Sequence, residues 1–272
     1  MSLYTILGAS GFVGSRLVAS LRADGHEVYA PARGEPDVFA RDLGQVIYCI
    51  GLTADFAVRP FDTVEAHVGL LAGVLREARF SHLTYLSSTR LYDSLGAKGG
   101  QEQSSLELNP ANPRHLYDLS KALGENLCLT VAGNRTAVAR LACVYDSSAG
   151  APGYLSEWLQ RSATERIIHL DSSTGYVRDY IHLDDVVAGL RAMSDCATSG
   201  IVNLASGENV SNGELAEVFN RCGWSISFSR ELPRQSVSQC DISRLTALWQ
   251  APRPVRDVVN TYLNTLRWNG TD

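Results

Sequence analysis

The sequence predicts an α/β protein built on a parallel, doubly wound sheet and followed by a smaller C-terminal α/β region. In the first part of the chain, short strand-like runs alternate with amphipathic helical patterns, which is typical of strand–helix–strand units. A glycine-rich loop joins the first predicted strand to the first predicted helix, as in Rossmann-like folds. The 272 residues leave room for one large domain or for two closely associated ones.

The elements of the first part are predicted from the spacing of their apolar residues. The predicted strands are 4–7, 26–30, 45–51, 82–88 and 136–145, and the predicted helices are 15–25, 64–79 and 114–132. Too few residues separate the second strand from the third to form the usual helix and strand, so we expect the sheet to be trimmed at that edge.

The character of the chain changes after Tyr145, where a loop precedes a helix at 154–163. We therefore expect a first domain at 1–146, to which residues 176–205 return, and a second region at 147–272. No linker rich in proline, serine or glycine separates the two parts, so they are expected to share a cleft.

Composition and charge exclude several classes of protein. The formal net charge of -5 and the lack of a basic run argue against a nucleic-acid partner. The N-terminal residues MSLYTILG contain no basic segment and no cleavable apolar core, so we expect no signal peptide and a cytoplasmic location. No apolar run is long enough to cross a membrane. The 6 cysteines are scattered without a C-x-x-C pair, which predicts buried thiols and no metal site.

Glycines recur at Gly8, Gly11 and Gly14, between a predicted strand and a predicted helix. Glycine allows the backbone to approach a ligand closely, and the free N–H groups at the start of a helix attract an anion. The spacing differs from the usual G-x-G-x-x-G, and a tight turn without a ligand is the alternative. The phosphate site predicted here consists of Gly8, Ser10, Gly11, Phe12, Val13 and Gly14.

Tyr117 and Lys121 are four residues apart in a predicted helix, so both side chains emerge on one face. A lysine ammonium near a phenol favours the phenolate and brings tyrosine into range for proton transfer. The hydroxyls of residues 87–89 lie at the end of a predicted strand, where open α/β sheets bind ligands. A tyrosine packed over a lysine stem, and ordinary turn chemistry at the serines, are the alternatives.

Together these segments resemble the extended short-chain dehydrogenase/reductase family, of the NAD-dependent epimerase/dehydratase type. Four more segments are similar to those of the family and occur in the same order, so that the likeness covers nearly the whole chain: VIYCIGLTADF, RLACVYD, YVRDYIHLDDVVAGL and IVNLASGENVSNGELA. The resemblance implies a nicotinamide cofactor and a nucleotide-activated sugar as substrate.

The resemblance also implies the catalytic roles. Tyr117 would be the general acid/base, Lys121 would tune it and bond the nicotinamide ribose, and Ser88 matches the catalytic Ser/Thr of the family. Ile50 and Gly51 would contact the cofactor. Hydride would pass between a sugar carbon and the nicotinamide while the tyrosine takes or returns the hydroxyl proton.

On the substrate side, the resemblance implies that Arg178 contacts the substrate diphosphate, a task that suits a guanidinium. Arg234 is a weaker second candidate. An ion pair of Arg178 with Asp179 or Asp184 is the structural alternative.

Several positions depart from the family pattern. Cys143 replaces an asparagine and Asp146 a glycine, which puts one sugar contact in doubt, although Thr89 and Cys143 stay candidate substrate contacts. His67 replaces another asparagine and is predicted to be structural. The two aspartates at 184–185 are expected to cap the helix that follows them.

The residues after the second strand bear on the choice of cofactor. NAD enzymes of this fold carry an acid at this position to bond the ribose 2′-OH, whereas this chain has Ala32 followed by Arg33. The guanidinium favours the 2′-phosphate of NADP. Glu35 or Asp37 could still reach a 2′-OH, so NAD stays possible.

The segment after Ser88 bears on the reaction. Dehydratases of this type continue T-D-E from the catalytic threonine, whereas this chain reads Ser88-Thr89-Arg90, so we expect an epimerase or a ketoreductase. A catalytically silent sensor or scaffold with the same fold is the alternative, and the retained Tyr117 and Lys121 argue against it.

Family likeness further implies a homodimer through four helices, two from each subunit, at 64–79 and 114–131. Gly69, Ala72 and Gly73 would permit close packing, although small residues also suit packing onto the sheet.

Overall fold

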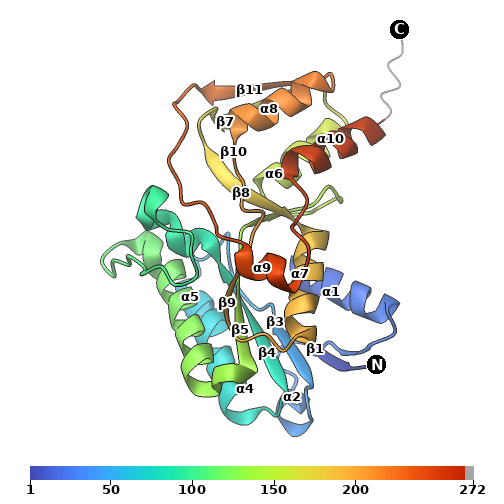
Figure 1. The fold of residues 1–272 in the computed structure, drawn as a ribbon, viewed down its shortest axis with the longest axis vertical. Helices are drawn as coiled ribbons and strands as arrows, with labels where there is room; N and C mark the ends of the chain where they lie inside the picture. The colour runs from blue at the N-terminus through green and yellow to red at the C-terminus, as the bar shows by residue number, and fades with distance from the viewer. Residues whose placement is uncertain (267–272) are drawn as a thin grey trace.

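The computed structural model describes residues 1–266. Its larger part is a six-stranded parallel sheet in the order β2-β1-β3-β4-β5-β9, with helices on both faces (Figure 1). The last strand comes from late in the chain, so this sheet is not built from one continuous segment. Its strands are β1 (Leu3–Leu7), β2 (Glu27–Tyr29), β3 (Gln45–Tyr48), β4 (His82–Ser88), β5 (Thr136–Leu141) and β9 (Gly200–Leu204).

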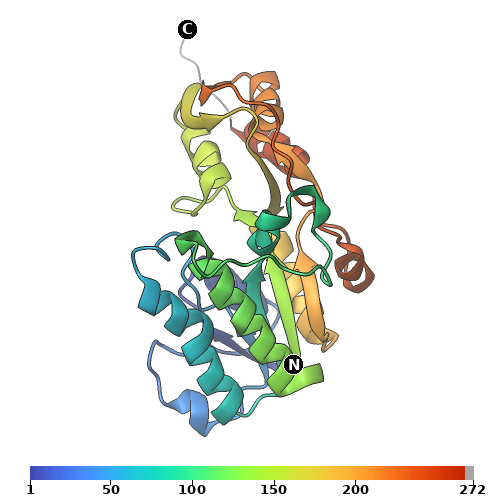
Figure 2. The same ribbon diagram turned by 90° about the vertical axis from the view of Figure 1, so that its left-hand side faces the viewer.

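Each face of the sheet is covered by helices that bury an apolar side. One face carries α1 (Phe12–Ala23) and α7 (Leu183–Asp195). The other carries a helix that runs through α3 (Pro60–Val64), η1 (Glu65–Gly69) and α4 (Leu70–Glu77), and beside it α5 (Leu116–Leu127) with η4 (Cys128–Ala132), as Figure 2 shows. The first of these helices begins earlier than predicted because Pro60 suits the first helical turn.

The sheet is trimmed next to β2, as predicted. Only α2 (Asp37–Ala40), a helix of 4 residues, lies between β2 and β3, and β2 is the edge strand.

The single strand predicted at 136–145 was wrong, because the chain leaves the sheet at Ala142. The Ala142 N–H still donates to the Leu204 carbonyl at 3.1 Å. The next residues form β6 (Cys143–Tyr145), which pairs with β8 (Val177–His182) in a different sheet. This change of sheet carries the chain from the first part of the molecule into the second.

The second part is a smaller α/β region with its own core around Trp158 and Phe219, shown above the large sheet in Figure 1. Its helix α8 begins with a capping box between Ser211 and Glu214. The remaining strands are β7 (Ile167–Ser173), β10 (Asn209–Ser211) and β11 (Ser225–Arg230), and the remaining α-helices are α6 (Tyr154–Ser162), α8 (Asn212–Arg221), α9 (Ser243–Leu248) and α10 (Val255–Thr265). Three 3₁₀ helices belong to the first part of the chain: η2 (Thr89–Lys98), η3 (Pro113–His115) and η5 (Gly133–Arg135). The predicted region 147–272 extends to residues 267–272, outside the described residues.

The structure corrects two smaller predictions. Cys143 and Cys196 are exposed rather than buried, although all six thiols are free. The cap of α7 is His182, whose Nδ1 accepts from the Asp184 N–H at 3.2 Å, while the aspartates at 184–185 occupy the first turn. Among residues 1–266 no helix is long and apolar enough to span a membrane, and no cluster of side chains is suited to hold a metal ion.

Candidate active site

The glycine loop between β1 and α1 leaves no space for a side chain at Gly8 or at Gly14. Gly8 has a φ of +89°, and a Cβ there would lie 2.9 Å from the main chain of Cys49 and Ile50. A Cβ on Gly14 would lie 2.3 Å from the Gly8 carbonyl oxygen. The Gly11 N–H donates to the same oxygen at 3.0 Å, and α1 then begins with no acidic residue in its first turn. The loop therefore fits a diphosphate, whose charge the helix N-terminus favours.

The other residues predicted for this loop differ in exposure. Ser10 is exposed, whereas Phe12 and Val13 are half-buried, and Val13 packs against the main core.

Gly14→Ala is expected to weaken binding of a nicotinamide dinucleotide at least tenfold, because the new methyl group must displace the Gly8 carbonyl. Fluorescence titration with NADPH and NADH measures the dissociation constants. Gly73→Ala is the control, since a Cβ there would meet nothing closer than Phe39 at 4.0 Å. Unchanged affinity in Gly14→Ala would contradict a dinucleotide seat in this loop.

The segment after β2 holds a carboxylate and a guanidinium. Glu35 accepts from the Tyr29 hydroxyl at 3.0 Å and from the Ala32 N–H at 3.0 Å. The Arg33 side chain is exposed and has no hydrogen bond or ion pair within residues 1–266.

Lys121 lies under the loop that follows β3. Its side chain is buried, and Nζ donates to the Leu86 carbonyl at 2.8 Å. A Cβ on Gly51 would lie 3.4 Å from this Nζ, so the glycine keeps the space above the ammonium open, beside Ile50. Burial lowers the pKa of Lys121 to about 7.

Tyr117 is 4 % exposed, one helical turn before Lys121. Burial raises the pKa of its phenol, while the hydroxyls of Ser88 and Thr53 and the charge of Arg90 lower it. The Ser88 Oγ accepts from the Arg90 N–H at 3.2 Å, which leaves its own O–H free to donate. The structure thus brings a hydroxyl of β4 together with a phenol of α5.

His67 connects this site to the loop after β3. Its Nε2 accepts from the Leu52 N–H at 3.2 Å, and its Nδ1 lies 2.8 Å from the Ser120 Oγ, which itself donates to the Tyr117 carbonyl at 2.9 Å. These partners require a neutral ring with its proton on Nδ1, and burial lowers the pKa of His67 to about 3. The His67 side chain is therefore structural, and it supports the helix that carries Tyr117.

A narrow cavity of about 40 Å³ brings together three of the predicted substrate residues: Thr89, Cys143 and Arg178. Although Cys143 is exposed as a residue, desolvation of its thiol by the surrounding protein raises the pKa to about 11, so the thiol stays protonated. Asp93 also lines this cavity, and sequence reasoning missed it.

Arg178 does not form the ion pair that was its structural alternative. Its guanidinium lies 4.3 Å from the centre of the Tyr176 ring, and Nη1 donates to the Val177 carbonyl at 2.9 Å. Asp179 accepts instead from Ser206 and Gly207, and Asp184 pairs with Arg16. Arg178 is therefore not tied to Asp179 or Asp184, and it interacts electrostatically with Asp93 in its cavity.

Arg234 lies beside the cavity of Arg178, because Asn209, to which it donates, lines that cavity. It pairs with Glu214 and donates to the Asn209 carbonyl at 2.6 Å, and it does not line the cavity of Arg178.

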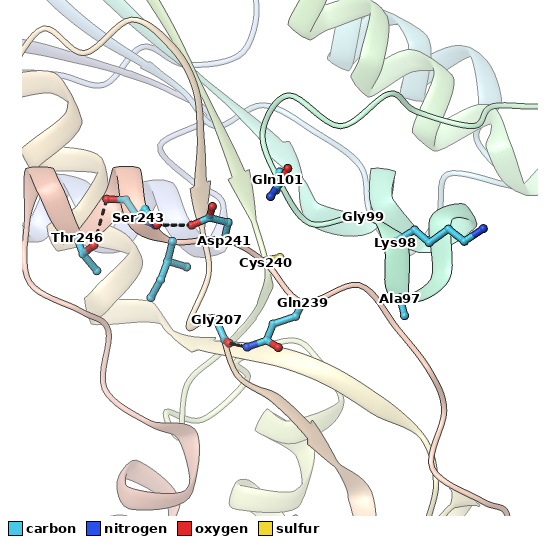
Figure 3. Close-up of a pocket in the computed structure, with 11 residues that line it drawn as sticks. Ala97, Lys98, Gly99, Gln101, Gly207, Gln239, Cys240, Asp241, Ser243 and Thr246 are labelled. Carbon is cyan, nitrogen blue, oxygen red and sulfur yellow. Dashed lines mark hydrogen bonds between the residues drawn. The ribbon is translucent and has the colours of Figure 1, made fainter.

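A larger, open hollow of about 620 Å³ lies between the end of η2, the segment 239–241 and α9 (Figure 3). Two of its lining side chains bind within the hollow: Gln239 donates to the Gly207 carbonyl at 2.9 Å, and Asp241 accepts from the Ser243 N–H at 2.9 Å. Neither Tyr117 nor Lys121 lines it. This hollow is therefore separate from the predicted acid/base groups.

Comparison with known proteins gives consistent findings. A family model described as the NAD dependent epimerase/dehydratase family matches residues 4–205. UDP-glucuronic acid decarboxylase 1 of Xenopus tropicalis is 21% identical over 300 residues, covering 96% of this chain and 71% of its own. RMD from Pseudomonas aeruginosa, solved with NADPH, is 20% identical with a TM-score of 0.76, covering 98% of this chain and 99% of its own. UDP-glucose 4-epimerase from Thermotoga maritima, solved with UDP-glucose, is 16% identical with a TM-score of 0.76, covering 97% and 98%.

Proposed function

Because the chain belongs to the NAD-dependent epimerase/dehydratase family, we propose that it is an enzyme that transfers hydride between a nicotinamide cofactor and a nucleotide-activated sugar. The reaction would be reduction of a 4-ketone or epimerisation at a carbinol carbon. The observation that carries the proposal is the meeting of the Ser88 hydroxyl with the buried phenol of Tyr117, one turn from Lys121. UDP-sugars as substrates are supported by the two relatives whose names contain them.

The acid/base chemistry is assigned to Ser88 and Tyr117. In the oxidising direction the phenolate of Tyr117 takes the proton of the sugar hydroxyl, and in the reducing direction the phenol returns it. Ser88 donates a hydrogen bond to the same sugar oxygen, since its acceptor side is already used by the Arg90 N–H. When bound, the nicotinamide supplies the hydride chemistry.

The binding roles follow from the same geometry. The glycine loop would hold the cofactor diphosphate, and Lys121, beside Gly51, would hold the nicotinamide ribose. Arg178 would bind the substrate diphosphate with its guanidinium, which forms no ion pair with Asp179 or Asp184.

We further propose NADP as the cofactor, with NAD as the alternative. Both oxygens of the Glu35 carboxylate already accept a hydrogen bond, whereas Arg33 is exposed and free to meet a 2′-phosphate. The cytoplasmic location stays a prediction.

The test is to incubate the purified protein with each cofactor and a panel of nucleotide sugars, with products followed by mass spectrometry. The proposal expects reduction or epimerisation of one of these sugars, faster with NADP(H), and loss of that preference in Arg33→Ser. Tight cofactor binding without any product would favour the sensor or scaffold alternative.

A homodimer is part of the proposal. Apolar side chains are exposed on the adjacent helices of one face, among them Phe61 (88%), Leu70 (43%) and Leu123 (49%), and Figure 2 shows these helices side by side. Gly69 is exposed within the same patch, whereas Gly73 faces Phe39 of α2.

Sedimentation velocity at micromolar concentration is expected to show a dimer for the native chain and a monomer for Leu70→Glu, because a charge in the apolar interface would stay unpaired. Ile167→Glu, which changes an apolar side chain that is 74% exposed in the second part of the molecule, should leave the dimer intact. A native chain that sediments as a monomer would rule out this interface.

A further inference from the structure

Arg90 lies directly on the face of the proposed acid/base group. Its guanidinium carbon is 5.0 Å from the centre of the Tyr117 ring and 4.8 Å from the centre of the Phe56 ring. Arg90 follows Ser88 by two residues at the start of η2, so the segment that carries the catalytic hydroxyl also carries this cation.

Two contacts hold the guanidinium in this position. Its Nε lies 3.2 Å from the carboxylate of Asp118, whose side chain is 9% exposed, and its Nη2 donates to the Arg114 carbonyl at 3.1 Å. Asp118 follows Tyr117 directly on α5. The ion pair therefore joins η2 to the helix that carries the tyrosine.

Lys121, the other cation of the site, makes different contacts. The Lys121 ammonium donates to the Leu86 carbonyl and lies 4.9 Å from the centre of the Tyr85 ring. Arg90 is thus the positive charge stacked on the phenol, where cation–π attraction and the field of the guanidinium both favour negative charge on the ring.

We propose that Arg90 is a positioning residue for Tyr117: anchored by Asp118, it holds the phenol in place and stabilises the phenolate form. This inference rests on the proposed function, in which Tyr117 moves the proton. It adds a second cation to the one that the family resemblance implies.

The groups around Tyr117 determine what a pH profile reports. Arg90 from η2 and Asp118 from α5 carry charge, and Lys121 from α5 titrates near neutral pH because burial lowers its pKa to about 7. His67 from η1 is neutral because of its lowered pKa. Further polar neighbours are the hydroxyls of Thr53 and Ser88 and the phenol of Tyr85 from β4, whose pKa burial raises far above its usual range. Asp93 and Arg114 lie next to Arg90.

Removal of Arg90 is expected to shift the pKa of Tyr117 in one direction. Arg90 lowers the pKa of Tyr117, so its loss raises that pKa and reduces the phenolate present at neutral pH. In Arg90→Met, the rising limb of the pH–rate profile for alcohol oxidation should shift to higher pH by about one unit. At pH values below this limb, oxidation should be about tenfold slower than in the native enzyme. Arg90→Lys, which keeps the charge but loses the planar contact, should lie between Arg90→Met and the native enzyme.

The experiment compares native, Arg90→Met, Arg90→Lys and Arg114→Met enzymes with cofactor bound. Arg114→Met is the matched control, since it removes a neighbouring exposed arginine that is not stacked on the ring. The pH–rate profiles are accompanied by NMR titration of Tyr117 labelled at Cζ, with Tyr117→Phe to assign the signal.

The outcomes separate this inference from the proposed function. An upward shift of the Tyr117 titration in Arg90→Met but not in Arg114→Met supports the role of Arg90, even if no sugar is turned over. An unshifted titration and a uniformly slower rate would overturn it, since that is the result of a structural role. If Arg90→Met does not fold, Arg90→Lys carries the test, and a titration equal to that of the native enzyme would overturn the proposal.

Discussion

Tyr117→Phe is expected to lower turnover by about 10²- to 10⁴-fold, the range that general acid–base catalysis contributes. The substitution removes the only group assigned to move the hydroxyl proton. The ring contacts of residue 117 should survive, because they do not involve the phenolic oxygen. The centres of the Phe56 and His67 rings lie 5.7 Å and 5.3 Å from the centre of the Tyr117 ring. Steady-state kinetics with the sugar identified by the panel measures the loss.

Cofactor affinity should change little in Tyr117→Phe, because the glycine loop and Lys121 are unaltered. Tyr262→Phe is the matched control: it also removes one phenolic hydroxyl, which donates to the Leu159 carbonyl in the second part of the molecule. Near-normal turnover by Tyr117→Phe would refute this tyrosine as the proton carrier.

Glu125→Ala is expected to lower the free energy of unfolding by about 3–5 kcal/mol, the usual effect of leaving one partner of a buried ion pair alone. Glu125 and Arg140 face each other between α5 and β5, with side chains 4% and 3% exposed and 2.6 Å between Oε2 and Nη2. The same carboxylate accepts from Ser87 at 2.5 Å. Its removal would leave the Arg140 guanidinium buried with the Tyr92 hydroxyl as its main partner.

Urea denaturation measures this loss. Glu77→Ala is the control. The ion pair of Glu77 with Arg76 is on the surface, with side chains 48% and 73% exposed, and should contribute no more than about 1 kcal/mol. The double variant Glu125→Leu, Arg140→Met should be more stable than Glu125→Ala, because it leaves no charge buried. Equal free energies of unfolding for Glu125→Ala and Glu77→Ala would contradict the stabilising role assigned to the ion pair of Glu125 and Arg140.

Local patterns in the sequence were sufficient for most of the fold. The strand and helix periods predicted the large sheet and its trimmed edge, and the family resemblance is confirmed by the match over residues 4–205. The strand predicted at 136–145 was wrong because apolar residues continue through Ala142, and the change of sheet there depends on the partners β9 and β8.

The sequence by itself determined that a glycine loop opens α1 and that Tyr117 and Lys121 share one face of a helix, since both follow from short-range geometry. Only the tertiary structure decided that Arg90 stacks on Tyr117, that His67 supports the same helix, and that Glu125 meets Arg140. Each of these contacts joins segments 15 or more residues apart. Their distance and burial depend on how the helices and strands pack, which the spacing of residues along the chain does not encode.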